Sequence, residues 1–152
     1  MAVSTVMCNR LFVSTDSGED LSLIRSDQFI FGPATSEEVR SVQGVLKHQN
    51  VWSLLCRFGG CSCHFRHLMH ESIDLGFAES ADWLPEDDDD VFATRGVYDF
   101  LADLVDHGDK VDLVDIWDND FPADVPRLVV SLSEVSRETF RFFEGCAFEL
   151  TK

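Results

Sequence analysis

Basic residues are scarce in this chain, which has 12 Lys and Arg residues against 28 Asp and Glu residues and a formal net charge of −16. A field of that sign repels the phosphates of nucleic acids and the anionic surface of a membrane. We therefore expect neither as a direct partner. Basic proteins, basic peptides and cations are the partners that such a charge attracts.

Long hydrophobic runs are also missing. No stretch approaches the ~20 apolar residues that a membrane-spanning helix needs. The first eight residues show neither the basic start nor the long apolar segment of a secretory signal. The five cysteines are an odd number at irregular spacings, which is typical of reduced thiols rather than of a disulfide framework. These absences predict a cytoplasmic protein.

Familiar enzyme motifs are absent as well. The sequence has no phosphate-binding G-x-x-x-x-G-K-S/T loop, no G-x-G-x-x-G turn and no G-x-S-x-G nucleophile elbow. Carboxylates are too numerous for one pair to stand out as general acid and base, and no cysteine has a recognisable catalytic partner. The sequence names no catalytic residue and no cofactor. It favours a protein without enzymatic activity, and a small enzyme without a readable motif is one alternative.

The 152 residues, 45% of them hydrophobic, suit a single domain over residues 1–152 with one core. Apolar residues at helical spacing predict one helix from the capping box at Thr35 to near His48 and another from Thr94 to Gly108, after a long loop over 69–92. Alternating patterns predict strands over residues 6–14, 21–25, 28–31, 51–58, 61–66, 111–117, 128–132, 140–143 and 146–150. This order predicts an α+β fold, a two-layer sandwich with a mostly antiparallel sheet and two main helices.

Two cysteines and three histidines fall within residues 61–70. If Gly59 and Gly60 form a two-residue hairpin turn, strand alternation places these side chains on one apolar face: Cys56, Phe58, Cys61, Cys63 and Phe65. That placement favours core packing without a metal. The alternative is a small zinc-binding protein using Cys61, Cys63, His64 and His67, since thiolates and imidazoles are zinc ligands.

Acidic residues concentrate in residues 82–124, which hold 15 of them against two Lys or Arg residues. On the second expected helix Asp99, Asp103 and Asp106 recur opposite the apolar stripe, and Asp112 and Asp115 continue the acidity beyond it. Like charges at i,i+4 destabilise a helix by about 0.2–0.5 kcal/mol per pair, so local stability does not explain this pattern. Two interpretations stay open: a solvated face that confers solubility, or a face formed by these five residues that binds a basic partner.

Gly-Cys-Ser-Cys-His-Phe-Arg at 60–66, an acidic loop, a helix, and Val-Asp-Leu-Val-Asp-Ile-Trp-Asp-Asn-Asp at 111–120 follow one another in the sequence. This order resembles small acidic bacterial proteins of no established function that contain a Cys-x-Cys-x-Phe segment. Small acidic proteins near toxin genes often serve as immunity proteins. The resemblance implies a non-enzymatic acidic binding protein that engages a basic protein partner, as an immunity protein or an inhibitor of a toxin or nuclease. It assigns no role to a particular residue.

Overall fold

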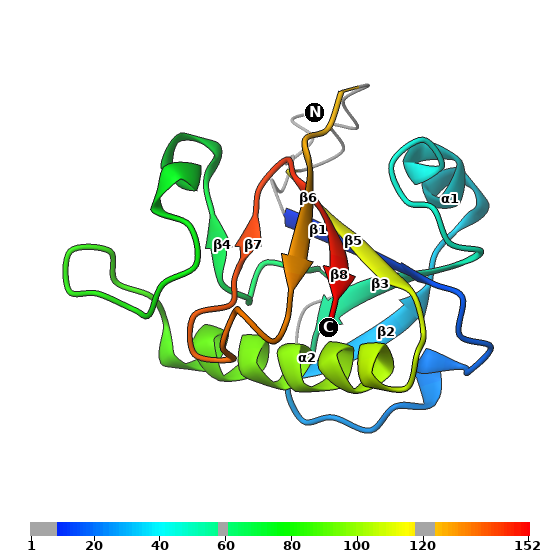
Figure 1. Cartoon of the computed structure of the whole chain (residues 1–152), viewed down its shortest axis with the longest axis horizontal. Helices are drawn as coiled ribbons and strands as arrows, with labels where there is room; N and C mark the ends of the chain where they lie inside the picture. The colour runs from blue at the N-terminus through cyan, green and yellow to red at the C-terminus, as the bar shows by residue number, and fades with distance from the viewer. Residues whose placement is uncertain (1–8, 58–60, 118–123) are drawn as a thin grey trace, which may run out of the picture.

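The computed structural model describes residues 9–57, 61–117 and 124–152. Over these residues the chain forms a six-stranded sheet in the order β2-β3-β1-β5-β8-β6 (Figure 1). The strands are β1 Asn9–Thr15, β2 Phe29–Pro33, β3 Asn50–Cys56, β5 Val111–Trp117, β6 Arg127–Ser131 and β8 Ala147–Thr151. All neighbours are antiparallel except β6 and β8. A separate parallel pair joins β4 His67–Leu68 to β7 Phe142–Phe143.

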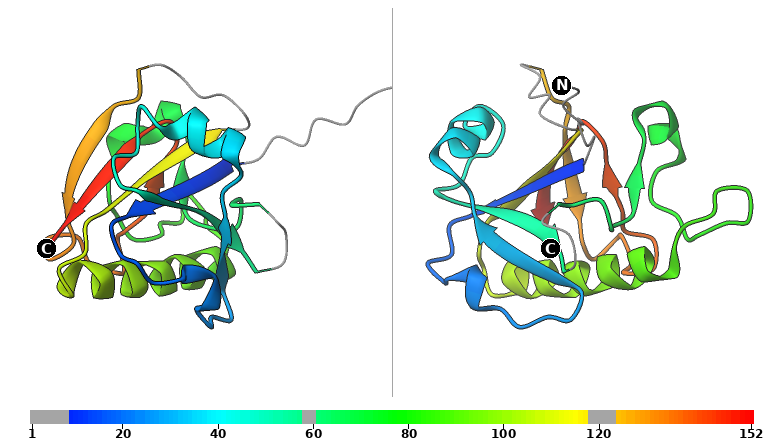
Figure 2. Two further views of the ribbon diagram at one scale, coloured as in Figure 1. Left: turned by 90° about the vertical axis from the view of Figure 1, so that its right-hand side faces the viewer. Right: turned by 180° about the vertical axis from the view of Figure 1, so that it is seen from behind.

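Two α-helices, α1 Ser36–Val42 and α2 Asp88–Asp106, lie on opposite sides of the six-stranded sheet (Figures 1 and 2). Of two short 3-10 helices, η1 Leu21–Leu23 lies between β1 and β2 in the chain, and η2 His70–Leu75 lies between β4 and α2. The buried stripe of α2, which includes Val97 and Leu101, belongs to the main core. A smaller cluster under α1 contains Phe12, Val42, Leu46, Val114, Ile116 and Ala147. The α+β class with a mostly antiparallel sheet is confirmed.

Helix α2 begins six residues earlier than its predicted cap at Thr94. The Asp87 side chain accepts a hydrogen bond from Asp89 N at 2.9 Å and caps the helix. Asp88, Asp89 and Asp90 then fill the first turn, where carboxylates interact favourably with the positive end of the helix dipole. The prediction of a loop as far as residue 92 is therefore wrong for its last five residues, because the acidic run starts the helix.

Helix α1 confirms the capping box. Thr35 Oγ1 accepts from Glu38 N at 3.1 Å, and Glu38 Oε1 accepts from Thr35 N at 2.9 Å. The helix ends at Val42 and not near His48. Gly44, which is unfavourable in a helix interior, follows two residues later.

The other differences concern short segments. Residues 21–25 contain η1 rather than a strand, since Asp20 caps that turn by accepting from Ser22 N. Residues 61–66 form no strand. Gly145 makes the expected final turn with φ of 77°, but β7 and β8 on either side of it enter different sheets. Residues 6–8 of the first expected strand, Phe58, and the Gly59-Gly60 turn lie outside the described residues.

None of the helices in the described part of the chain is both long and apolar enough to cross a membrane.

Candidate functional site: the outer face of helix α2

The solvent-facing side of α2 forms one stripe because its residues recur at multiples of about 3.6. The stripe consists of Asp88, Phe92, Arg95, Asp99, Asp103 and Asp106, and we call it the α2 outer face. Phe92 is 56% exposed, so its phenyl ring is open to solvent among charged neighbours. The structure thus brings the predicted residues Asp99, Asp103 and Asp106 together on one surface.

The middle of this face is electrically balanced. Arg137 donates from Nε and Nη2 to the two carboxylate oxygens of Asp99 at 3.0 and 2.9 Å. Arg95 pairs with Glu138. Asp99 is therefore already neutralised by a bidentate partner, which its position in the sequence did not reveal.

The C-terminal end of the face keeps its negative charge. Asp103 is 72% exposed and lies 3.9 Å from His107 Nδ1. The backbone carbonyl and carboxylate of Asp103 raise the pKa of His107 above its ordinary value. Among the residues that the structure describes, no Lys or Arg forms an ion pair with Asp103 or Asp106.

The N-terminal end of the face borders a cavity of about 560 Å³. Its lining residues are Asp27, Gln28, Cys56, Arg57, His64, Asp87, Asp89, Asp90, Phe92 and Ala93. Four carboxylates thus surround one space, with Arg57 held against Asp27 at 3.7 Å and His64 at 3.7 Å from Asp90. Burial, and after it the charge of Asp87, raise the pKa of Asp90, although His64 and His67 oppose them.

Sequence reasoning missed this cavity and Phe92. The signal was present, since Phe92 precedes Asp99 by seven residues, or two helical turns. This spacing is meaningful only if residue 92 lies within the helix, and the predicted helix began at Thr94 whereas α2 begins at Asp88.

Asp112 and Asp115, the other two predicted partner-binding residues, are both 0% exposed. They lie on β5, a central strand whose two sides are both covered, so alternation sends one to each face of the sheet. These two residues therefore do not belong to the α2 outer face, and the prediction that they form an exposed binding surface is wrong because both are buried.

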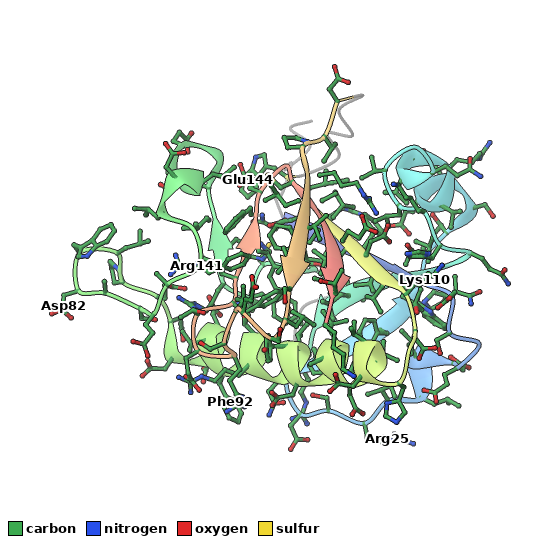
Figure 3. The ribbon with its side chains drawn as sticks, viewed as in Figure 1. Arg25, Asp82, Phe92, Lys110, Arg141 and Glu144 are labelled. Carbon is green, nitrogen blue, oxygen red and sulfur yellow. The ribbon has the colours of Figure 1, made fainter. Side chains whose placement is uncertain are left out.

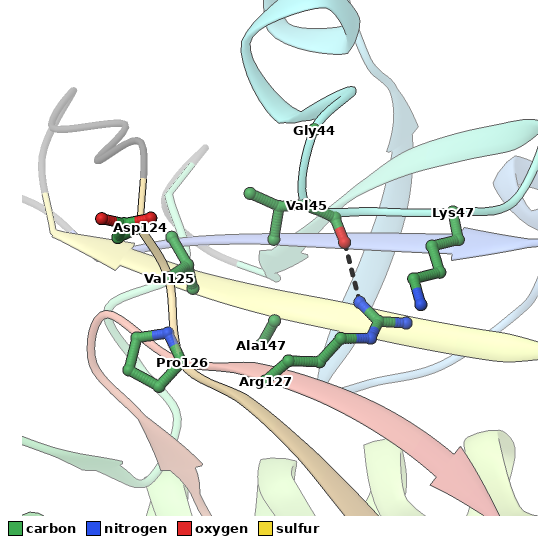
Figure 4. A pocket seen from close by; sticks show the side chains of 8 residues that line it. All are labelled: Gly44, Val45, Lys47, Asp124, Val125, Pro126, Arg127 and Ala147. Atoms are coloured by element: carbon green, nitrogen blue, oxygen red, sulfur yellow. Dashed lines mark hydrogen bonds between the residues drawn. The ribbon is translucent and has the colours of Figure 1, made fainter.

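Asp112 lies on the α1 side of the sheet and is a buried acceptor. Ser14 Oγ donates to it, as do Lys47 N at 3.0 Å and Arg127 Nη2 at 2.9 Å. Arg127 Nη1 also donates to the Val45 carbonyl at 2.7 Å, beside a cavity of about 400 Å³ (Figure 4). The carboxylate thus fixes the loop after α1 to the sheet, and its role is structural.

Asp115 lies on the other side, where it binds the ring of His67. His67 Nδ1 is 2.7 Å from Asp115 Oδ2, and Asn9 Nδ2 donates to Oδ1 at 3.1 Å. His67 Nε2 is 2.6 Å from the Ser62 carbonyl oxygen, which can only accept a hydrogen bond, so Nε2 carries a proton. Burial alone lowers the pKa of His67, but the charge and hydrogen bond of Asp115, with the Ser62 carbonyl and Asp90, outweigh it and raise the pKa.

This arrangement leaves no ring nitrogen of His67 free to act as a base or to ligate a metal. Of the remaining members of the predicted zinc set, Cys61 and Cys63 are half-buried and His64 is exposed. Within residues 9–57, 61–117 and 124–152, no group of three or more His, Cys, Asp or Glu residues is placed to hold a metal ion. Cys56 and Phe65 are buried in the main core.

The buried pair of His67 and Asp115 predicts that the stability of the protein depends on pH. A raised folded-state pKa means that the contribution of His67 is fully present below about 6.5 and is lost as pH rises through the folded-state value. We expect the free energy of unfolding to fall from pH 6 to pH 9, and Asp115→Asn to flatten that fall. Denaturant unfolding at several pH values across this range measures the free energy of unfolding. His48→Gln is the control, since His48 bonds Ser14 through its backbone N–H; equal pH slopes for wild type and Asp115→Asn would contradict the assignment.

Comparison of the chain with protein-family models, with curated proteins and with solved structures gave no match.

Proposed function

We propose that this protein is a non-enzymatic acidic binding protein that engages a basic segment of a partner protein through the α2 outer face and the cavity at its N-terminal end. Its concrete form is an immunity protein or inhibitor of a toxin or nuclease whose own surface is basic. The observation that carries the proposal is the 560 Å³ cavity, which has four carboxylates and one exposed phenyl ring on its wall.

The cavity has the chemistry that an arginine or lysine side chain requires. Its volume lies in the range of specific ligand pockets, about 300–1,000 Å³. Carboxylates such as Asp87 and Asp89 accept charge-assisted hydrogen bonds from a guanidinium. The exposed face of Phe92 offers a cation–π contact worth about 0.5–1 kcal/mol at a solvated site.

A second acidic patch, formed by Asp103 and Asp106, lies about 20 Å from Phe92 at the helical rise of 1.5 Å per residue. Negative charge in the last turn of a helix is unfavourable, so this patch does not stabilise α2. The carboxylates at the N-terminal end do stabilise it. A partner with two basic groups at this separation would contact both patches, while the neutral middle around Asp99 would contribute little.

The test uses a fluorescein-labelled peptide of nine arginines as the probe, and stopped-flow anisotropy as the readout. We expect Asp103→Asn/Asp106→Asn to slow association at least threefold at low salt, since long-range attraction sets the rate of encounter. The difference should vanish near 0.5 M salt, where screening is strong. Phe92→Ser should instead speed dissociation, because it removes a contact of the bound state.

The matched control is Glu71→Gln/Asp74→Asn, which removes the same charge from two exposed residues of η2 rather than of α2. Thermal melts should show the Asp103→Asn/Asp106→Asn variant unchanged or more stable by a few tenths of a kcal/mol. If the control pair slows association as much as the α2 pair, net charge alone attracts the peptide and the α2 outer face is only solvated surface.

A further inference from the structure

Two arginines and one glutamate meet in the interior beside the β4–β7 pair. The side chains of Arg66 and Arg141 are 1% and 3% exposed. Arg66 uses all five of its N–H donors: Nε and Nη2 bind Glu86 at 2.6 and 2.8 Å, Nη1 binds the carbonyls of Glu138 and Phe140, and Nη2 also binds the carbonyl of Ala78. Glu86 is thus committed mainly to Arg66.

Arg141 is left with an incomplete set of partners. Its Nη2 donates to the Ala78 carbonyl and lies 3.6 Å from Glu86 Oε1. Its Nε is buried, and no acceptor in the described part of the chain lies within hydrogen-bond distance of it. Burial and the charge of Arg66 lower the pKa of Arg141, although Glu86 opposes them.

One carboxylate therefore serves two buried guanidinium groups, an excess of one positive charge. The Glu138 carboxylate does not compensate it, since it pairs with Arg95 and Arg137. An uncompensated buried charge is among the costliest features of a protein interior. The arrangement calls for a further negative charge next to Arg141.

Arg141 lines a cavity of about 60 Å³ together with residues of the loop that carries Asp82. Figure 3 labels both Arg141 and Asp82. The other lining residues are Leu75, Ala78, Glu79, Ala81, Trp83 and Leu84. The space exceeds the ~30 Å³ that a water molecule occupies in the liquid. It is far smaller than the several hundred Å³ of a pocket for an organic ligand.

We propose that this cavity binds a small monovalent anion of the size of chloride or formate against Arg141. The anion supplies the missing acceptor and the second negative charge. Glu79 is exposed and forms no ion pair with any residue that the structure describes, so its carboxylate competes with the anion only from the rim. This site is independent of the α2 outer face, so either proposal can fail alone.

Unfolding in sodium chloride, sodium formate and sodium gluconate at one fixed ionic strength tests the site. Chloride and formate should raise stability in a saturable way, and gluconate, which is too large for the cavity, should not. At an anion concentration ten times its dissociation constant, the ratio of folded to unfolded protein should rise about elevenfold. Broadening of the chloride-35 NMR line by the folded protein, reversed by formate, gives a second readout.

Ala81→Val narrows the cavity and leaves both arginines in place, so it should abolish the saturable response. Arg141→Met should abolish it too, and Glu79→Gln should shift it to lower anion concentration. Arg137→Met, which removes an exposed arginine bound to Asp99, is the control that keeps the response. Equal stability of the wild type in all three salts would overturn the proposal, as would a full response in Ala81→Val. A response in Glu79→Gln that the wild type lacks would overturn it by identifying Glu79 as the counter-ion.

Discussion

Arg66→Met is expected to lower the free energy of unfolding by about 2–6 kcal/mol, the sum for two buried carbonyls that each lose a donor. Arg141 would still accompany Glu86, so the carboxylate keeps one cation. The loss comes chiefly from the carbonyls of Glu138 and Phe140, which would be left buried without a donor, at about 1–3 kcal/mol each. Unfolding in guanidinium chloride measures the change in the free energy of unfolding.

Two further variants sharpen this expectation. Arg66→Lys should recover little, because three ammonium donors cannot reproduce five donors in a planar fork. Arg57→Met is the control: this half-exposed arginine bonds the Asp27 carbonyl, and its loss should cost at most about 1 kcal/mol. If Arg66→Met costs no more than Arg57→Met, the network around Glu86 does not stabilise the fold.

Asp112→Ala is expected to destabilise the protein by a similar amount, about 3–5 kcal/mol. Three donors would lose their shared acceptor: Ser14 Oγ, Lys47 N and the guanidinium of Arg127. The loop after α1 should loosen at the same time, since Lys47 and Arg127 connect it to the sheet. Denaturant unfolding measures the loss in the free energy of unfolding. The hydrogen-exchange rate of the Lys47 amide measures how often the loop after α1 opens.

Asp103→Ala is the matched control for Asp112→Ala, since it removes the same carboxylate from an exposed position and should change stability by at most about 0.5 kcal/mol. The double variant Asp112→Ala/Arg127→Met should cost less than the sum of its single variants, because the two residues share one interaction. Equal effects of Asp112→Ala and Asp103→Ala would show that the buried carboxylate contributes nothing specific.

The features predicted correctly from the sequence are those that depend on neighbouring residues only. The capping box at Thr35 needs only four consecutive residues, and β5 was predicted over its full length, 111–117. The apolar stripe of α2 was likewise readable, because its spacing repeats within the helix. The α+β class follows from the order of such elements.

The candidate site was predicted only in part, because burial depends on distant segments. Asp103 and Asp106 lie where the helical period places them. Asp112, predicted to lie on the binding face, is instead buried in β5. Val111-Asp112-Leu113-Val114-Asp115-Ile116 carries apolar residues at both odd and even positions, which is typical of a strand covered on both faces. Any carboxylate in such a strand must be buried and paired.

The network partners could not be read from sequence. His67 and Asp115 are 48 residues apart, and Arg66 and Phe140 are 74 apart. No local spacing connects such pairs, and the residues next to Arg66 and Arg57 do not show that the first is buried and the second half-exposed.

The place of β1 in the sheet affects how the protein folds during synthesis. β1 lies between β3 and β5, and its register with β5 joins Asn9 to Trp117. A growing chain can assemble β2, β3 and β1 once residue 56 has left the ribosome, but β1 then forms an open edge for at least 55 further residues, about 3–11 s at 5–20 residues per second. An unpaired edge strand is a template for intermolecular pairing. Translation speed between β3 and β5 therefore sets how long this chain is exposed to aggregation before its central strand is paired on both sides.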